Sequence, residues 1–106
     1  MSETARARVL EKAKELICKD RNGQYGEPMD NFAVIAELWG TYLSCRSVPP
    51  GVKVELEPAD VGMMMGLFKA ARYATADSAM ADTFIDTAGY VACAAECAGI
   101  RAEDVS

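Results

Sequence analysis

The apolar residues of this 106-residue chain recur every three or four positions along four segments, a spacing typical of amphipathic α-helices. The spacing predicts helices near residues 3–19, 31–44, 58–74 and 78–98, with a tail over 100–106. Between the second and third helices, the alternation of Val52, Val54 and Leu56 indicates a short extended piece. The prediction is therefore a single all-α domain over residues 1–106, folded as a compact four-helix bundle.

Residues that favour helix ends mark the predicted boundaries. The candidate N-caps are Ser2 for the first helix, Asp30 or Asn31 for the second, and Asp77 or Ser78 for the fourth. Pro58 suits the first turn of the third helix, where its missing N–H breaks no hydrogen bond. Gly99 suits the end of the fourth helix.

The predicted helices carry more apolar surface than one small bundle buries. The apolar face of the second helix comprises Phe32, Ile35, Leu38, Trp39 and Tyr42. The third helix holds three consecutive methionines, Met63 to Met65, and the fourth holds a run of alanines. A small bundle buries about a third to a half of each helix circumference, so we expect the surplus to be buried in a homodimer or homotetramer.

Composition excludes several classes of protein. With 11 basic and 16 acidic side chains the net charge is −5, which argues against binding to duplex nucleic acid. The chain has no run of 18 apolar residues and no signal-peptide core, so we expect a cytoplasmic protein that does not bind membranes. Four cysteines without a CxxC motif, and the absence of histidine, remove the usual zinc ligand sets, and the cysteines are expected to be small buried thiols.

Two aspartates, Asp82 and Asp86, lie one turn apart in the apolar fourth helix. They share a stripe with further residues, namely Gly89 or Tyr90, Cys93 and Cys97. Like charges at this spacing repel, so the stripe needs a partner. It either binds a hard metal ion, or pairs with Lys69 and Arg72 of the preceding helix, or faces water in a cleft. Lys69 and Arg72 are also candidates for neutralising a triphosphate.

Carboxylates at this spacing suit magnesium. Mg²⁺ is often held by one or two carboxylates together with substrate phosphates, so Asp82 and Asp86 are candidate metal ligands and catalytic residues. Glu37 is a candidate general base, and Asp60 is a candidate base and third metal ligand. The alternatives are a solvated surface position for Glu37 and a helix-capping role for Asp60.

The loop from Asp20 to Pro28 contains two glycines that permit close approach of the backbone to a ligand. Around it, Arg21, Tyr25 and Asn31 supply a cation, a ring and an amide, the groups that bind a nucleotide base or phosphate. Tyr90 is a candidate wall of a base pocket. The alternatives are that Tyr25 packs onto the bundle and that Tyr90 belongs to the core.

Several short motifs carry a family resemblance over most of residues 10–95. They are Asp20-Arg21, Tyr25-Gly26, Asn31-Phe32, IAELWGTYL, PADVGMMMGLFKAAR and DTFIDTAGY. With these motifs the chain is similar to a small domain family of unknown function found in bacteriophages and bacteria. More distantly it resembles the MazG-like all-α nucleoside triphosphate pyrophosphohydrolases, and the Tyr-Gly and Asn-aromatic pairs resemble those of phage dATP/dGTP diphosphohydrolases.

The distant resemblance implies a four-helix fold that binds magnesium and cuts a nucleotide between its α- and β-phosphates. Those enzymes hold the metal with an ExxE motif on one helix and an ExxD motif on the next. This chain departs from both motifs, because Glu37 stands alone in the second helix and the later motif is Asp82-xxx-Asp86.

Three functions follow as hypotheses. The first is a magnesium-dependent nucleoside triphosphate pyrophosphohydrolase, and the second is a protein that binds or sequesters a nucleotide or a nucleotide-derived molecule without cutting it. The third is a small oligomeric module whose methionine-rich face binds another protein.

Overall fold

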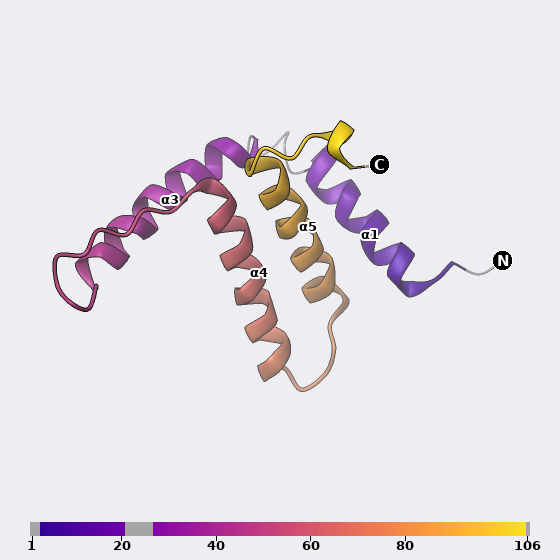
Figure 1. Cartoon of the computed structure of the whole chain (residues 1–106). Helices are drawn as coiled ribbons and strands as arrows, with labels where there is room; N and C mark the ends of the chain where they lie inside the picture. Colours follow the sequence, from indigo (N-terminus) through magenta and orange to yellow (C-terminus); the bar gives the residue numbers. More distant parts are fainter. Residues whose placement is uncertain (1–2, 21–26, 106) are drawn as a thin grey trace.

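The computed structural model describes residues 3–20 and 27–105 (Figure 1). The α-helices are α1 (Ala5–Glu15), α3 (Pro28–Cys45), α4 (Pro58–Thr75) and α5 (Ala81–Cys97). α1 continues into a π-helical turn, η1 (Leu16–Asp20), and the tail contains a 3₁₀ turn, η2 (Ala102–Asp104). No strand forms within the described residues, so the extended piece expected near Val52 to Leu56 joins no sheet there, and the all-α prediction with four helices is confirmed. Within the same residues, no helix is both long and apolar enough to cross a membrane.

The first two helices begin at residues other than the predicted caps. α1 begins after Thr4, whose hydroxyl oxygen accepts a hydrogen bond of 3.2 Å from the N–H three residues further on. The predicted cap Ser2 lies outside the described residues. α3 begins at Pro28, so Asp30 and Asn31 lie inside the helix and do not cap it. Proline is compatible with the first helical turn, which explains the earlier start.

The start of α4 and the end of α5 agree with the prediction, whereas the start of α5 does not. Pro58 starts α4 and Gly99, at a φ of +93°, follows the end of α5, as predicted. α5, however, begins at Ala81, so neither Asp77 nor Ser78 caps it. These two residues lie in the connection that reverses the chain between the antiparallel α4 and α5.

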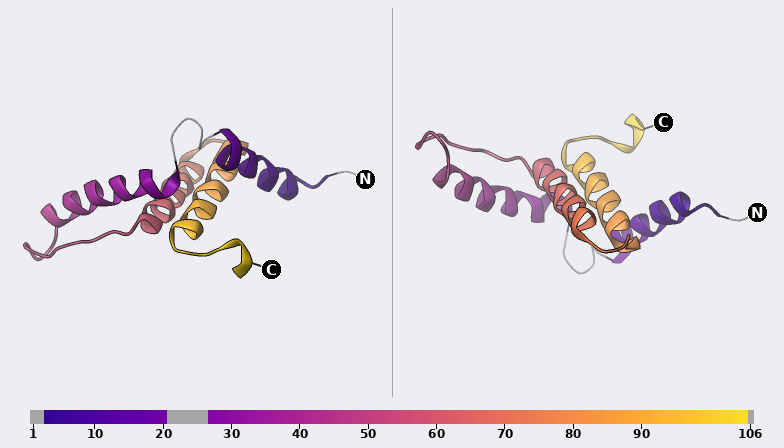
Figure 2. Two further views of the ribbon diagram at one scale, coloured as in Figure 1. Left: turned by 90° about the horizontal axis from the view of Figure 1, so that it is seen from above. Right: turned by 90° about the horizontal axis from the view of Figure 1, so that it is seen from below.

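α4 and α5 form an antiparallel hairpin at the centre of the fold, with α1 on the far side of α5 (Figures 1 and 2). The helices of the hairpin approach closely at Gly62. A Cβ atom there would lie 2.9 Å from the Tyr90 carbonyl oxygen and 2.7 Å from the Cβ of Ala94. Glycine is therefore required at this contact.

The core lies where α3 meets the hairpin. Phe32 and Ala36 of α3 pack there with Val61 of α4 and Cys93 of α5, and Val61 has no exposed surface. Partly buried residues surround this core, namely Ile17, Ile35, Trp39, Leu56, Met65, Tyr90 and Cys97. The expectation of buried thiols is correct for Cys93 but wrong for Cys18 and Cys45, which are exposed.

The helices do not close into the compact bundle that the sequence predicts. The radius of gyration is 15.9 Å, and the molecule measures 58 × 38 × 28 Å. A compact chain of this length has a radius of gyration of about 13 Å. Figure 1 shows the reason, because α3 projects away from the α4–α5 hairpin and forms an arm.

The arm formed by α3 buries only part of its apolar face. Phe32 is buried as predicted, whereas Leu38 is 64% exposed and Tyr42 is 65% exposed. The chain after α3 returns along one side of the arm, and there the Val54 N–H donates a hydrogen bond of 2.8 Å to Ser44 Oγ. This return covers the side of α3 that carries Gly40 and Ser44, and it leaves Leu38 and Tyr42 uncovered.

Candidate functional site

The α4–α5 hairpin holds an ion pair. Lys69 Nζ lies 3.0 Å from Asp86 Oδ2, and the two side chains are 17% and 37% exposed. The structure thus places Lys69 and Asp86 together within one chain. Of the alternatives open for the aspartate stripe, Asp86 takes the pairing with the preceding helix. Asp82, one turn earlier, is exposed. Arg72 makes a different contact, since its guanidinium carbon lies 5.9 Å from the centroid of the Phe68 ring.

A hollow of about 460 Å³ lies beside this ion pair, and we call it the polar cleft. It is lined by Lys69, Arg72, Thr75, Ala76, Met80, Asp82, Thr83 and Asp86. Four of the charged residues that the sequence singled out on these two helices, Lys69, Arg72, Asp82 and Asp86, therefore face one hollow. Two cations and two carboxylates in one cleft can bind a phosphate group directly or through a metal ion.

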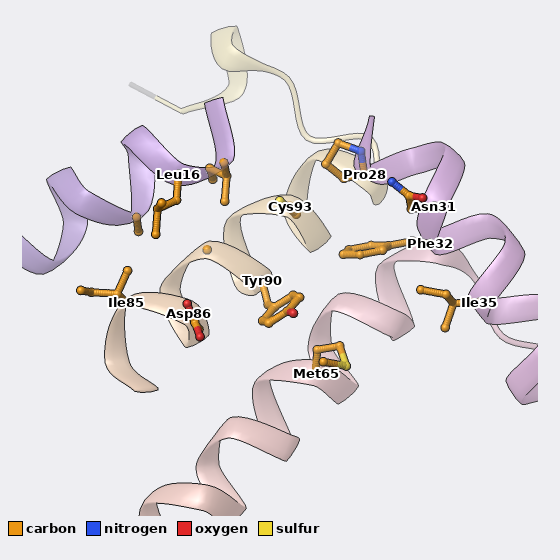
Figure 3. A pocket seen from close by; sticks show the side chains of 13 residues that line it. Leu16, Pro28, Asn31, Phe32, Ile35, Met65, Ile85, Asp86, Tyr90 and Cys93 are labelled. Atoms are coloured by element: carbon orange, nitrogen blue, oxygen red, sulfur yellow. The ribbon is translucent and has the colours of Figure 1, made fainter. Parts of the chain in front are cut away.

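A second hollow, of about 240 Å³, lies where α1, α3, α4 and α5 meet, and we call it the apolar cavity (Figure 3). Its lining is mostly apolar, with the rings of Phe32 and Tyr90 among residues from all four helices. The remaining lining residues are Ala13, Leu16, Ile17, Pro28, Asn31, Ile35, Met65, Ile85, Asp86, Gly89 and Cys93. Such a cavity suits a flat apolar ring that a few polar groups hold in orientation.

Asp86 lines both hollows, so the apolar cavity and the polar cleft are neighbours. Figure 3 shows its carboxylate between Ile85 and Tyr90, at the side of the cavity. The arrangement can accept a molecule with a flat apolar ring at one end and an anionic group at the other.

The stripe predicted on the fourth helix forms much of this site. Asp86, Gly89, Tyr90 and Cys93 all line the apolar cavity, and Asp82 lines the cleft. Sequence reasoning missed the lining residues of other helices, which include Phe32, Ile35 and Met65, because apolar periodicity assigns them to the core. The threonines of the cleft, Thr75 and Thr83, were also missed, and the sequence holds no signal for them.

Two predicted acidic residues lie apart from this site. Asp60 accepts a hydrogen bond of 2.8 Å from the Glu57 N–H, so it caps the N-terminal end of α4, whereas Lys69 lies in the second half of that helix. Glu37 is exposed and lines another hollow, between α3 and residues 51–58. Within the part of the chain that the structure describes, no three Asp, Glu, Cys or His side chains gather into a metal-binding group. The structure therefore does not bring Asp60 or Glu37 together with Asp82 and Asp86.

The loop residues proposed to contact a nucleotide are only partly placed. Arg21 and Tyr25 lie outside the described residues. Asn31 lines the apolar cavity, and its side-chain amide donates a long hydrogen bond of 3.5 Å to the Glu27 carbonyl oxygen. Of these three candidates, the structure thus places Asn31 at the site.

Cys97 lies on the same helix stripe, one turn beyond the cavity residue Cys93. Burial raises the pKa of the Cys97 thiol, and the neighbouring carboxylate of Glu96 raises it further. A thiol with a raised pKa stays protonated at neutral pH, so it is a poor nucleophile and a poor metal ligand.

Comparison with known proteins shows the family. Residues 8–98 match the family described as a domain of unknown function, DUF6378, and the chain belongs to this family. The family assignment agrees with the predicted resemblance to a domain family of unknown function.

Two curated relatives come from bacteriophages. The Gene 55 protein of Mycobacterium phage D29 is 38% identical over 85 residues, which are 80% of this chain and 50% of that protein. The Gene 55 protein of Mycobacterium phage L5 is 38% identical over 82 residues, 77% of this chain and 47% of that protein. The chain thus spans about half the length of these relatives. No solved structure matches the chain.

Proposed function

We propose that this member of the DUF6378 family binds a nucleotide or a nucleotide-derived molecule. The base occupies the apolar cavity, and the phosphates occupy the polar cleft. The observation that carries the proposal is the position of Asp86 in the lining of both hollows, which makes them one two-part site. A nucleotide has the matching composition, with an apolar ring at one end and anions at the other.

The size of the apolar cavity supports the binding of a base. Its volume of about 240 Å³ lies below the range of about 300–1,000 Å³ that is typical of whole-ligand pockets. The cavity therefore suits one ring system, with the rest of the ligand outside it. Phe32 and Tyr90 offer ring surfaces for packing, and Asn31 offers an amide that can donate and accept hydrogen bonds.

Lys69 and Arg72 supply the positive charge for the phosphates. Both line the polar cleft, and Lys69 is the more shielded, with a side chain that is 17% exposed. A phosphate in the cleft competes with Asp86 for the ammonium group of Lys69. Binding of an anion is thus coupled to the ion pair between the helices.

Magnesium-dependent hydrolysis of the nucleotide is the second candidate function. It is favoured by the presence of Asp82 and Asp86 in the same cleft as the two cations. Two carboxylates fit Mg²⁺ when substrate phosphates complete the coordination, and a bound ion would supply charge stabilisation at the phosphoryl oxygens. Asp86 would have to release Lys69 to act as a ligand. Because Glu37 and Asp60 lie elsewhere, we favour binding over hydrolysis.

A thermal-shift panel tests the proposal. It contains nucleoside triphosphates, cyclic dinucleotides and ADP-ribose derivatives, each with and without Mg²⁺, and products are analysed for every ligand that binds. A ligand at 100 times its Kd stabilises the folded state by about 2.7 kcal/mol, which is easily detected. Unfolding temperatures that no member of the panel changes would contradict the proposed function.

Substitution of Asp86 separates the two functions. Asp86→Asn frees Lys69 from its carboxylate partner. A binder should keep or increase its affinity for the nucleotide, whereas a hydrolase should lose Mg²⁺-dependent stabilisation and product formation. Lys69→Met should weaken binding in either case. Lys53→Met is the matched control, since Lys53 pairs with Glu55 on the surface with a side chain that is 79% exposed.

A further inference from the structure

An apolar trough lies in the angle between the arm and the hairpin. It has a volume of about 680 Å³ and is lined by Trp39, Tyr42, Leu43, Met64, Met65 and Phe68. Together with Leu38 and Leu67, which adjoin it on the two helices, we call this surface the α3–α4 face. The trough is open because α3 diverges from α4 (Figures 1 and 2).

Four large apolar side chains on this face are at least half exposed. Leu38 is 64% exposed, Tyr42 65%, Leu67 71% and Phe68 50%. A large side chain of this kind has an area of about 150–250 Å², so these four residues alone leave on the order of 500 Å² of apolar surface exposed. That value is at the upper end of the range for the largest apolar patch of a monomer, about 300–600 Å².

We infer that the α3–α4 face binds the same face of a second copy of this chain. Its area suits such a contact, because a standard interface buries about 800 Å² on each partner, of which about 450 Å² is non-polar. In a twofold-symmetric dimer each surface meets its own copy, so one patch of this size serves both partners.

Charge favours a second copy at this position. The chain carries a net charge of −5, so two copies repel one another over most of their surfaces. The six residues that line the trough are all uncharged, so two copies can meet there without opposing like charges. An apolar face that meets itself also needs no complementary charge pattern on its partner.

Shape favours a second copy as well. α3 has 18 residues and is about 27 Å long, and its outer part projects from the molecule. This arm, with Leu38 and Tyr42 exposed, can lie in the trough of the second copy, and the arm of that copy can lie in the first trough. The exchange would bury the apolar side of α3 that the chain itself leaves uncovered.

The contact also bears on the candidate site, although the inference does not depend on nucleotide binding. Met65 lines both the trough and the apolar cavity. A second copy in the trough therefore packs against one wall of the cavity and holds that wall in place.

Sedimentation velocity over a range of protein concentrations tests the inference. The full chain should sediment as a dimer of about 23 kDa, twice the 11.4 kDa of one chain. Tyr42→Glu and Leu38→Glu should each raise the Kd of the dimer at least 100-fold. Both side chains are more than 60% exposed, so these changes remove little core packing, and circular dichroism should show an unchanged helix content.

Leu10→Glu is the matched control, because Leu10 is 64% exposed but lies on α1, away from the face. This variant should remain a dimer. A wild-type chain that is monomeric at the highest concentration measured would overturn the inference and leave the face to another protein. A dimer that both variants on α3 leave intact, or that Leu10→Glu weakens equally, would overturn it too.

Discussion

Replacement of Gly62 by alanine should destabilise the protein, because the added methyl group has no room. Its Cβ would lie 2.7 Å from the Cβ of Ala94, 3.1 Å from the Cα of Ala94 and 2.9 Å from the carbonyl oxygen of Tyr90. Two of these three atoms belong to the backbone of α5, so a side-chain rotation cannot relieve the clash. The helices must separate, and overpacking of this kind costs about 1–3 kcal/mol.

Alanine also favours the helix, which offsets part of this cost. In a helix interior alanine is about 0.8–1.0 kcal/mol more favourable than glycine. The net effect of Gly62→Ala is therefore a loss of about 1 kcal/mol of unfolding free energy. For a domain of this size that loss lowers Tm by about 4–8 °C.

Gly66→Ala is the matched control, one turn further along α4. The nearest atom to a Cβ at Gly66 is Cγ2 of Val91, at 3.8 Å, which is an ordinary contact. This variant should gain about 0.8–1.0 kcal/mol from helix propensity without a steric cost. The difference between the two variants isolates the clash and should be about 1–3 kcal/mol.

Urea denaturation followed by far-UV circular dichroism measures both variants. All samples must have the same protein concentration, because association changes the apparent stability. Equal stabilities of Gly62→Ala and Gly66→Ala would refute the close approach of α4 and α5 at Gly62.

Three further predictions concern the ion pair, a helix cap and the thiols. Lys69→Met should cost at most about 1 kcal/mol of unfolding free energy in urea denaturation, since its partner Asp86 is 37% exposed and partly screened by water. Thr4→Ala should cost about 0.5–2 kcal/mol in the same assay, because it removes the hydroxyl that caps α1, and an unchanged midpoint would contradict that cap. In thiol labelling at neutral pH followed by mass spectrometry, exposed Cys18 should react before Cys97, and the Cys97 rate should reach its plateau at a higher pH than that of an unperturbed thiol, because burial raises its pKa. Equal labelling rates would contradict the burial of Cys97.

The sequence predicts the helices well because each has a clear apolar periodicity. It predicts their starts less well, since a proline at position 28 and a chain reversal over residues 76–80 outweigh the capping preferences of Asp30 and Ser78. Periodicity alone does not show whether the helices close into a compact bundle. Periodicity shows that Leu38 and Tyr42 lie on an apolar face of α3, but it does not show what covers that face.

The candidate site is also predictable only in part. The i, i+4 spacing of Asp82 and Asp86 predicts a stripe shared with Tyr90, and Asp86 and Tyr90 both line the apolar cavity. The basic pair on the preceding helix indicates the partner of Asp86, which is Lys69. The separation of Asp60 from this stripe depends on the antiparallel pairing of α4 with α5. That pairing, like the contribution of α1 and α3 to the cavity, is a property of tertiary packing that local spacing does not encode.

The central claim is that one ligand occupies two adjoining hollows, and amide chemical shifts of the isotope-labelled chain test it most directly. A nucleoside should shift the signals of Phe32 and Gly89 at the apolar cavity, and pyrophosphate should shift those of Thr75 and Thr83 at the polar cleft. The corresponding nucleoside triphosphate should shift both sets together and saturate them with a single Kd. Shifts confined to other parts of the chain would contradict the two-part site. Shifts that do not saturate as the ligand concentration rises would contradict it as well.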